Sequence, residues 1–282
     1  MKLLVFGKTG QVARELILQG SAHEITALGR DPADLSDPVA CAAIIAQSDA
    51  DAVINAAAYT SVDKAEEEEA LATIINGDTP GAMARACVAR GIPFLHVSTD
   101  YVFDGTGETP WSPSDPVAPQ NAYGRSKLAG EEAVRAAGGP YLILRTSWVF
   151  SAHGANFVKT MLRLSESRDQ LTVVADQIGG PTAARDIARA LLAIAPQLGA
   201  RKGGTYHFAG QPPVSWADFA RVIFVKSGRK MQVADIPTSD YPTPAKRPLN
   251  SRMDCADLTT DFGVTIPDWR ASLDEVLRDL EA

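Results

Sequence analysis

The sequence predicts an α/β fold: a doubly wound, mainly parallel sheet with a smaller C-terminal α/β lobe. Three observations indicate this fold. Short apolar strands alternate with amphipathic helices through residue 150, a glycine-rich turn joins the first strand to the first helix, and the alternation loosens from about residue 151. We therefore expect a dinucleotide-binding domain over residues 1–150 and a mainly substrate-binding lobe over residues 151–282, with later segments completing the sheet.

The first part of the chain follows the order strand, turn, helix. Lys2–Phe6 is a nearly all-apolar run, as in parallel strands that are buried on both faces, and a helix over Gln11–Gln19 comes after the turn. Further strands are expected at 24–28, 52–55, 94–98 and 141–145. A helix over 79–90 should end at Gly91, another should begin near residue 122, and the acidic run 66–69 lies near the start of a third helical region.

The second part of the chain has looser periodicity. We expect helices over residues 156–168, 184–194, 216–227 and 271–280, and strands over residues 171–174 and 205–208. Residues 236–250 contain four prolines and the basic pair Lys246 and Arg247. We expect a long rigid loop there, because prolines lower the entropy cost of ordering a segment that faces a ligand.

Composition and charge narrow the classes of function. The chain has 282 residues, 45% of them hydrophobic, and a formal net charge of −7, so it can bury a core but lacks the basic surface that binds nucleic acid. No apolar run approaches the roughly 18 residues of a membrane span, and the chain starts directly with a strand, so we expect neither membrane insertion nor secretion. Three cysteines without CxxC spacing indicate reduced thiols in a cytoplasmic protein, and four dispersed histidines argue against a zinc site.

The turn after the first strand suits a dinucleotide. Gly7-x-x-Gly10-x-x-Ala13 lies between a predicted strand and a predicted helix, where a Rossmann-like fold binds a pyrophosphate on the helix N-terminal amides. Glycines permit the tight turn, and a methyl group at Ala13 still allows the helix to pack closely on the strand. Two glycines in a turn are often only a turn, so the argument depends on their position after the first strand.

The end of the second strand bears on the choice of cofactor. Arg30 lies where dinucleotide folds contact the adenosine ribose, and an arginine there suits a 2′-phosphate, whereas an acidic residue suits a free 2′-hydroxyl. We therefore favour NADPH, with NADH as the alternative because Asp31 is adjacent. Asp34 and Leu35 could frame the adenine, although Asp34 could equally be a turn residue.

Two further groups of polar residues follow predicted strands. Thr99 and Asp100 come at the end of the strand 94–98, and ligands of parallel sheets bind beyond the carboxyl ends of strands. Tyr123 and Lys127 are four residues apart on a predicted helix, where Cβ atoms lie about 5–6 Å apart. A nearby cation lowers the pKa of a phenol, so this pair could supply a proton donor, although the spacing also occurs by chance.

These motifs together resemble the extended short-chain dehydrogenase/reductase family. Beyond the glycine turn and the Tyr123-x-x-x-Lys127 pair, the resemblance includes Ser98-Thr-Asp-Tyr101 and, within the reductases of nucleotide-linked 4-keto-6-deoxy sugars, Asp176-Gln-x-Gly-x-Pro-Thr182 and Arg247-Pro-x-Asn-Ser251. The segments run in order over residues 6–251, almost the whole chain. The resemblance implies NAD(P)H-dependent reduction of the C4 ketone of dTDP-4-dehydro-β-L-rhamnose to dTDP-L-rhamnose.

The resemblance also implies roles for individual residues. Tyr123 would donate the proton, Lys127 would bind the cofactor ribose and lower the pKa of the phenol, and Thr99 would hydrogen-bond the carbonyl oxygen. The remaining positions would bind the sugar (Asp100, Trp148), the pyrophosphate (Gly10, Gln11, Val12) and the middle of the cofactor (Ala58, Tyr59, Thr60). Charge and loop placement add candidates for the substrate diphosphate, for which surface or capping roles are equally open: Asn156, Lys159, Arg247 and Arg252.

Glu15 bears on whether the chain binds a metal ion at a dimer contact. Some related reductases bind Mg²⁺ at a dimer contact through carboxylates, one of which matches Glu15. A partner carboxylate appears here as Arg185, and a cation beside a metal is repulsive, so we doubt that Mg²⁺ is bound. The chain is expected to be a monomer or a homodimer.

Other readings of the same motifs stay open. A dehydratase of this family would carry Asp-Glu after the strand-end threonine, whereas Tyr101 follows Asp100 here. A nucleotide-sugar epimerase, or a reductase that gives a talose product, is harder to separate because residue types do not report stereochemistry. A non-catalytic subunit resembling the regulatory subunit of methionine adenosyltransferase is disfavoured by the presence together of Thr99, Tyr123, Lys127 and Trp148.

Overall fold

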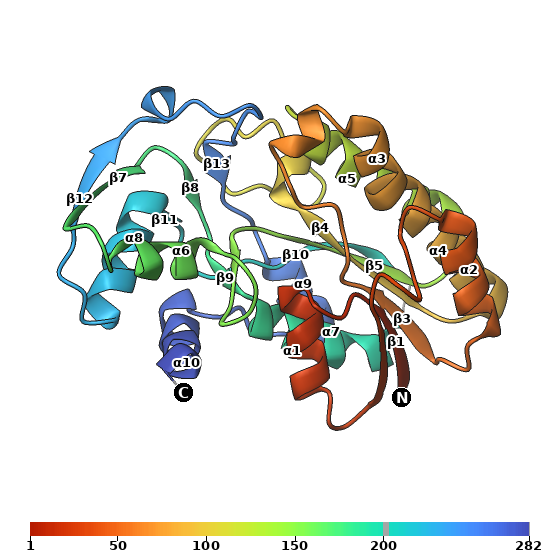
Figure 1. The fold of residues 1–282 in the computed structure, drawn as a ribbon. Coiled ribbons are helices and arrows are strands. Elements are labelled where there is room, and N and C mark those ends of the chain that lie inside the picture. Colours follow the sequence, from red (N-terminus) through yellow and green to blue (C-terminus); the bar gives the residue numbers. More distant parts are fainter. Residues whose placement is uncertain (200–202, 282) are drawn as a thin grey trace.

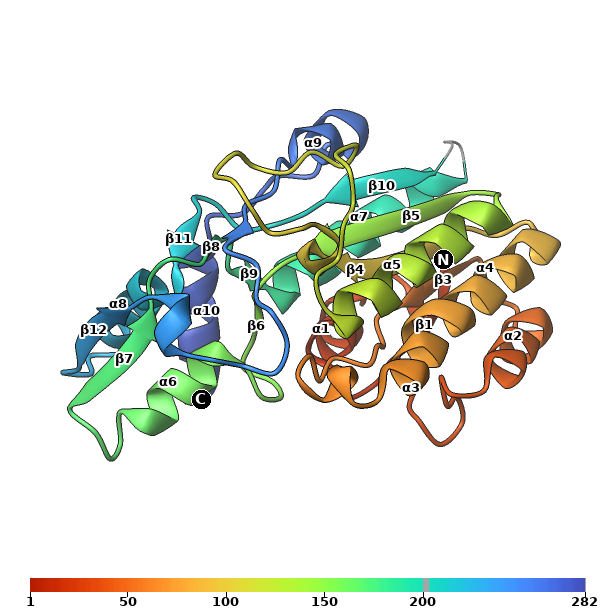
Figure 2. The same ribbon diagram turned by 90° about the horizontal axis from the view of Figure 1, so that it is seen from above.

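A computed structural model describes residues 1–199 and 203–281, so residues 200–202 and 282 of the predicted C-terminal lobe lie outside the described residues. Helices pack on both faces of a central parallel sheet, and a smaller group of strands and helices lies beside that sheet (Figures 1 and 2). The predicted α/β fold with a mainly parallel sheet is therefore confirmed.

The central sheet has six parallel strands in the order β10-β5-β4-β3-β1-β2. In chain order they are β1 (Lys2–Phe6), β2 (Glu24–Leu28), β3 (Ala52–Asn55), β4 (Phe94–Thr99), β5 (Tyr141–Thr146) and β10 (Gly204–His207). The chain winds one way from β1 to β2 and the other way from β3 onward. Ligands of such sheets bind beyond the carboxyl ends of the strands near this reversal, between β1 and β3.

Alternating side chains of the strands bury against the two helical layers. Leu3 and Val5 of β1 pack with α1 (Gln11–Gln19) and α7 (Ala184–Leu198), whereas Leu4 and Phe6 pack on the opposite side. That opposite layer comprises α2 (Pro38–Gln47), α4 (Thr79–Arg90) and α5 (Ala122–Ala137), with α3 (Glu69–Thr73) joined to α4 by a π-helical turn, Ile74–Asp78. Helix α9 (Ala256–Phe262) packs with α7.

The smaller part is held by a second apolar core rich in aromatic side chains, including Phe150, Phe219 and Trp269. Its helices are α6 (Phe157–Leu164), α8 (Trp216–Lys226) and α10 (Trp269–Glu281). Its strands form three small sheets: β7 (Gln170–Val174) with β12 (Gln232–Ile236), β6 (Val149–Phe150) with β9 (Thr182–Ala183), and β8 (Ile178–Gly179) between β11 (Val214–Ser215) and β13 (Asn250–Ser251).

Several elements differ from the sequence prediction. The structure adds α2, α9, β12 and the short strands β6, β8, β9, β11 and β13, and α6 ends at Leu164 instead of residue 168. Helix α7 continues to Leu198 with Pro196 in its last turns. The segment 236–250 is not wholly loop, because it contains a 3-10 turn over Thr238–Asp240 and leads into β13. In the described ranges, none of the helices has the length and apolar character needed to cross a lipid bilayer.

Candidate active site

The turn between β1 and α1 brings backbone amides to the carboxyl edge of the sheet. Gly7 has a φ of +115°, and an added Cβ would lie 3.3 Å from the Cβ of Ala13 and 3.4 Å from the backbone of Ala56. The positive φ therefore favours glycine, and the space for a side chain is tight. Gly10 is the N-cap of α1, and no side chain caps this helix and no acidic residue lies in its first turn. These amides suit a pyrophosphate group.

Gln11 connects this turn to the smaller part of the molecule. Its Oε1 accepts hydrogen bonds from Ser151 Oγ and Asn156 Nδ2, both at 3.0 Å. Asn156 also caps α6, accepting from Lys159 N at 3.2 Å, and Lys159 Nζ donates to Ala152 O at 3.0 Å. Asn156 and Lys159 thus lie next to the nucleotide turn, with their polar atoms holding the 151–156 loop.

The residues expected around the adenosine lie after β2. The Arg30 side chain is 77% exposed, and its Nε lies 3.9 Å from Asp34 Oδ1, so the guanidinium is open to a ligand. Hydrogen bonding from Ser36 lowers the pKa of Asp34, whose carboxylate closes a turn at Ser36 N. The carbonyl of Leu35 accepts from Thr79 Oγ1 at 2.6 Å, which fixes this turn against α4.

The segment after β3 is held by an asparagine that the sequence analysis did not identify. Asn76, in the π-helical turn, accepts from Tyr59 N at 2.8 Å and donates to Tyr59 O at 3.0 Å and to Ser126 Oγ of α5 at 3.0 Å. Ala58 and Thr60 flank this fixed residue. The Tyr59 hydroxyl donates to Glu68 at 2.7 Å, so this side chain points to the α3 side.

Thr99 and Tyr123 meet where β4 ends and α5 begins. Asn121 caps α5 by accepting from Gly124 N at 2.7 Å, which places Tyr123 in the first turn of the helix. Burial raises the pKa of the Tyr123 phenol to about 12, against a hydrogen bond with Thr99 that acts in the opposite direction. The expectation that Lys127 lowers this pKa is wrong for this arrangement, because burial dominates and the amino group of Lys127 contacts Val97 and His96 instead.

Lys127 turns toward the sheet. It is 1% exposed, and its Nζ donates to Val97 O at 2.7 Å and lies 3.2 Å from Nε2 of His96, a buried residue of β4. Burial lowers the pKa of Lys127 to about 8, with Glu131 opposing. Burial and the neighbouring Lys127 hold the pKa of His96 well below its ordinary value.

Asp100 presents an unpaired oxygen at the site. It is 2% exposed, its Oδ1 accepts from Thr99 Oγ1 at 3.0 Å, and burial raises its pKa to about 6, with the nearby Ser251 and Thr99 hydroxyls acting in the opposite direction. Within the described ranges, Asp100 Oδ2 and Ser251 Oγ are both buried without completing a hydrogen bond of normal geometry. Buried polar atoms are rarely left unpaired, so this pair suits a hydroxyl-bearing ligand.

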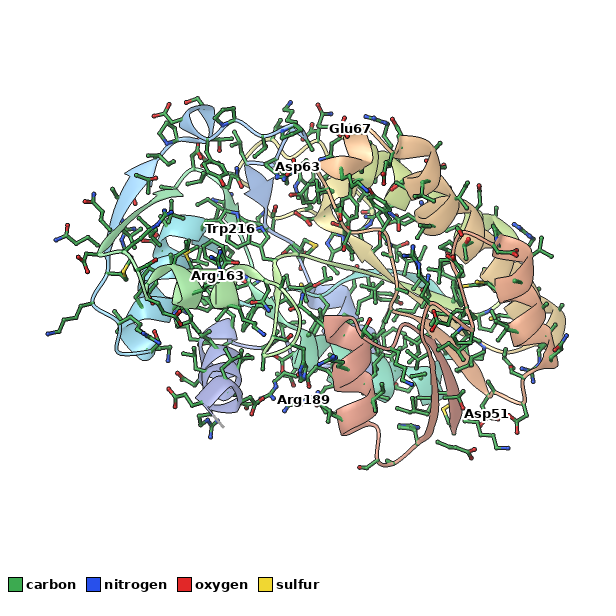
Figure 3. The ribbon with its side chains drawn as sticks, in the orientation of Figure 1. Asp51, Asp63, Glu67, Arg163, Arg189 and Trp216 are labelled. Carbon is green, nitrogen blue, oxygen red and sulfur yellow. The ribbon has the colours of Figure 1, made fainter. Side chains whose placement is uncertain are left out.

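Trp148 has a strained backbone and a well-packed ring. Its φ of +50° is uncommon for a bulky residue. The ring stacks on Trp216 of α8 with centroids 3.5 Å apart and planes 11° from parallel, and an added Cβ on Gly179 would lie 2.8 Å from it. Trp216, labelled in Figure 3, is itself held by a hydrogen bond from Nε1 to Gln177 Oε1 at 3.2 Å.

The arginines of the 247–252 segment are paired within the chain. Arg247 Nη2 donates to Asp63 Oδ2 at 2.7 Å, a contact that joins this segment to the larger part (Asp63 is labelled in Figure 3). Arg252 Nη1 donates to Asn250 Oδ1 at 3.0 Å. Arg247 thus anchors the segment, and each guanidinium keeps further N–H groups for a ligand.

Glu15 lies on the buried side of α1. Its carboxylate accepts from Gln19 Nε2 at 3.0 Å and lies 3.6 Å from His153 Nε2. Arg185 is paired with Glu275 and Asp279 of α10. Over residues 1–199 and 203–281, no three His, Cys, Asp or Glu side chains gather in a way that could hold a metal ion.

Comparison with known proteins identifies the family. A family model described as the RmlD substrate binding domain matches residues 1–282. A dTDP-4-dehydrorhamnose reductase from Sinorhizobium fredii is 45% identical over 281 residues, which cover 96% of this chain and 95% of that protein. The chain belongs to the dTDP-4-dehydrorhamnose reductase family.

Solved structures of dTDP-4-dehydrorhamnose reductases share the whole fold. The crystal structure of the Clostridium acetobutylicum protein matches with a TM-score of 0.94 at 38% identity and covers 100% of both chains. The Bacillus anthracis protein, solved in complex with NADP, matches with a TM-score of 0.91 at 32% identity and covers 99% of both chains. The family predicted from the motifs is thus confirmed.

The sequence analysis missed several residues of the candidate site. They are Asn55, Asn76, His96, Trp216 and Ser251, each of which contacts a predicted site residue or its backbone support. Their partners lie far away in sequence, so spacing could not reveal them. The one local indication was that Ser251 ends the motif Arg247-Pro-x-Asn-Ser251, which carries part of the family resemblance.

Proposed function

We propose that this chain catalyses the NADPH-dependent reduction of the C4 ketone of dTDP-4-dehydro-β-L-rhamnose to dTDP-L-rhamnose, the last step in making that sugar nucleotide. Membership of the reductase family supports the reaction. The observation that carries the proposal is the convergence of Thr99, Tyr123 and Lys127 where β4 ends and α5 begins, at the same edge of the sheet as the glycine turn.

The phenol of Tyr123 is suited to act as the acid. With a pKa of about 12 it carries its proton at neutral pH, yet it remains far more acidic than an ordinary alcohol. NADPH supplies a hydride to C4 when bound. The oxyanion formed at the sugar is a stronger base than phenolate, so the Tyr123 proton moves to it readily, and the Thr99 hydroxyl would hydrogen-bond the carbonyl oxygen at which this charge develops.

Two features support the cofactor assignment: the uncapped backbone amides at the start of α1, and Arg30. The pyrophosphate would be bound by Gly10, Gln11 and Val12. The middle of the cofactor would lie against Ala58, Tyr59 and Thr60, and the adenine would lie between Asp34 and Leu35. The open guanidinium of Arg30 favours the 2′-phosphate of NADPH over NADH. Lys127 would reach the nicotinamide ribose. We assign no metal ion.

The sugar nucleotide would lie between the larger part and residues 151–282. Asp100 and Ser251 would receive sugar hydroxyls, and Trp148, backed by Trp216, would offer an apolar face to the ring. The side chains near the junction are candidates for the diphosphate: Asn156, Lys159, Arg247 and Arg252. We expect a cytoplasmic monomer or homodimer without a nucleic-acid partner, in keeping with the net charge of −7 and three buried thiols.

The test is NADPH oxidation with a supplied dTDP-4-keto-6-deoxy sugar, followed by analysis of the C4 configuration of the product. Tyr123→Phe should keep NADPH binding and lose at least about a hundredfold in turnover, the usual scale for a general acid. The matched control is Tyr141→Phe, at the amino end of β5 and so at the opposite edge of the sheet. Wild-type turnover by Tyr123→Phe would remove this tyrosine from the mechanism, and a talose product would correct the stereochemical assignment.

A further inference from the structure

A chain of three buried polar side chains lies beneath the nucleotide edge of the sheet. It runs from Asn55, at the end of β3, through His96 of β4 to Lys127 of α5, and the three residues are 1%, 0% and 1% exposed. Asn55 Nδ2 is 3.2 Å from His96 Nδ1, and His96 Nε2 is 3.2 Å from Lys127 Nζ. The imidazole also lies nearly parallel to the ring of Phe94, with the two ring centroids 6.1 Å apart.

The backbone sets the direction of these hydrogen bonds. Ala57 N can only donate, and it donates to Asn55 Oδ1 at 3.2 Å. The amide orientation of Asn55 is assigned by that bond, and it turns the NH₂ group toward His96 Nδ1. Nδ1 must then accept, so the proton of the neutral ring is on Nε2, the nitrogen that faces Lys127.

An N–H group facing Lys127 suits one charge state of this lysine. A neutral amine donates one hydrogen to Val97 O at 2.7 Å and offers its lone pair to the Nε2–H of His96. An ammonium group has no lone pair and would oppose that N–H. Charging Lys127 therefore requires the ring proton to change from Nε2 to Nδ1 and the Asn55 amide to turn over, which breaks the bond from Ala57 N.

The charged groups around Lys127 do not reverse this preference. From α5, Glu131 lies one turn further on, but it is already paired with Arg145 and Arg135. From β4 and β3, His96 and Asn55 are neutral, and Tyr123 retains its proton. Burial accordingly lowers the pKa of Lys127 to about 8, opposed only by Glu131.

We propose that His96, with its tautomer set by Asn55, is a positioning residue that favours the neutral amine of Lys127 in the protein alone, and that in mildly alkaline solution cofactor binding is coupled to the uptake of one proton by Lys127. When the cofactor is bound, an ammonium group at Nζ can donate stronger hydrogen bonds to the ribose hydroxyl oxygens than a neutral amine can. The free energy of these bonds offsets the cost of changing the His96 tautomer. One proton is taken from solvent, and His96 stays neutral because it loses Nε2–H as it gains Nδ1–H. The inference rests on the proposed function, since it needs Lys127 to contact the cofactor.

Titration calorimetry of NADP⁺ binding to the whole protein tests this directly. At pH 9, in buffers of different ionisation enthalpy, the wild type should take up more than about half a proton per site, because a group with a pKa near 8 is then mostly neutral. The 2′-phosphate of NADP⁺ is fully ionised at that pH and does not contribute. Lys127→Met should bind NADP⁺ without this uptake.

Two variants test the role of the ring. In His96→Gln the side-chain amide can turn its oxygen toward an ammonium group, and in Asn55→Asp a carboxylate accepts from Nδ1–H and forces the other tautomer. Both should charge Lys127 before binding, reduce the uptake at pH 9 to less than half that of the wild type, and move the midpoint of its pH dependence upward.

The calorimetric results distinguish between the failure of this inference and the failure of the proposed function. Binding by the wild type without proton uptake between pH 8 and 9.5 would overturn the inference alone, as would wild-type uptake in a folded His96→Gln or Asn55→Asp protein. Uptake that persists in Lys127→Met would assign the proton to another group and overturn it too. Failure of the wild type to bind NADP⁺ at all would overturn the proposed function as well. The wild-type measurement decides even if a variant does not fold.

Discussion

The buried ion pair between Glu131 and Arg145, which anchors α5 to β5, gives a quantitative prediction. Glu131 of α5 is 0% exposed, and Arg145 of β5 is 2% exposed. The carboxylate accepts from Ser98 Oγ at 2.6 Å, from Arg145 Nε at 2.8 Å and Nη2 at 2.6 Å, and from Arg135 Nη1 at 3.2 Å. Burial opposes ionisation, but these donors together hold the pKa of Glu131 below its ordinary value.

Glu131→Gln keeps the shape of this side chain and removes its charge. The Arg145 guanidinium then stays buried without a counter-charge, and an amide NH₂ group faces N–H donors. Removing one partner of a buried pair costs about 3–5 kcal/mol, and a domain of this size loses roughly 2–4 °C in Tm for each kcal/mol, so a fall of about 10 °C is expected. The control is Glu132→Gln, the next residue of α5, which is exposed and should change stability by less than about 0.5 kcal/mol.

Thermal unfolding followed by circular dichroism at pH 7 measures the difference. Because the pKa of Glu131 is lowered by folding, its contribution is fully present above the unfolded value of about 4.3 and disappears as the pH falls through the folded value. The gap between Glu131→Gln and the wild type should therefore narrow below about pH 4. A Glu131→Gln protein that melts within 2 °C of the wild type at pH 7 would refute the assigned role of the pair.

Three further predictions concern the site and the thiols. Trp216→Leu should raise KM for the sugar nucleotide roughly three- to tenfold with little change in kcat, because aromatic stacking contributes about 0.5–1.5 kcal/mol, while Trp216→Phe should stay near the wild type; an unchanged KM in Trp216→Leu would contradict the stacking role. Arg30→Ala should raise KM for NADPH roughly tenfold and leave KM for NADH unchanged, and equal effects on both cofactors would show that Arg30 does not contact the 2′-phosphate. The native protein should not react with a thiol reagent at pH 8 and should yield three thiols on unfolding, because burial raises the pKa of Cys41 to about 11, of Cys87 to about 12 and of Cys255 to about 12. Rapid reaction of the folded protein would show that one of these thiols is accessible.

The helices and strands that were predicted correctly are those whose burial leaves a clear pattern in the local sequence. Strands such as Lys2–Phe6 are apolar on both faces because helices cover both sides of the sheet, and α4 ends at Gly91 because that residue adopts a left-handed conformation. Helix α2 was missed because its sequence PVACAAIIAQ is apolar on all sides and shows no helical period. Helix α9 buries only Leu258 and Phe262, too few to give a pattern.

In the candidate site, too, local sequence predicted some features, and contacts between distant segments decided the others. The spacing of Tyr123 and Lys127 places both on one helix, and that much is local. The direction in which Lys127 points is decided by β4, through Val97 O and His96, and the sequence gives no sign of it. The predicted effect on the phenol pKa was wrong for this reason: shared position on a helix does not determine which partner a flexible four-carbon side chain selects.

Helix α5, which carries Tyr123, is held by segments from across the chain, and this has a consequence for substrate binding. Ala122 N donates to Glu66 at 2.8 Å, and Asn121 Nδ2 donates to Lys246 O at 2.8 Å, so the start of α5 rests partly on the segment that leads to Ser251. Arg247 ties the same segment to Asp63 at 2.7 Å. A sugar that binds Ser251 therefore contacts a segment that is hydrogen-bonded, through Lys246 O, to the start of the helix carrying Tyr123. Asp63→Ala, which frees this segment, should therefore change kcat and KM together, although Asp63 is not among the residues proposed to contact the substrate, because the position of Tyr123 changes along with the binding of the sugar; unchanged kcat would contradict this link.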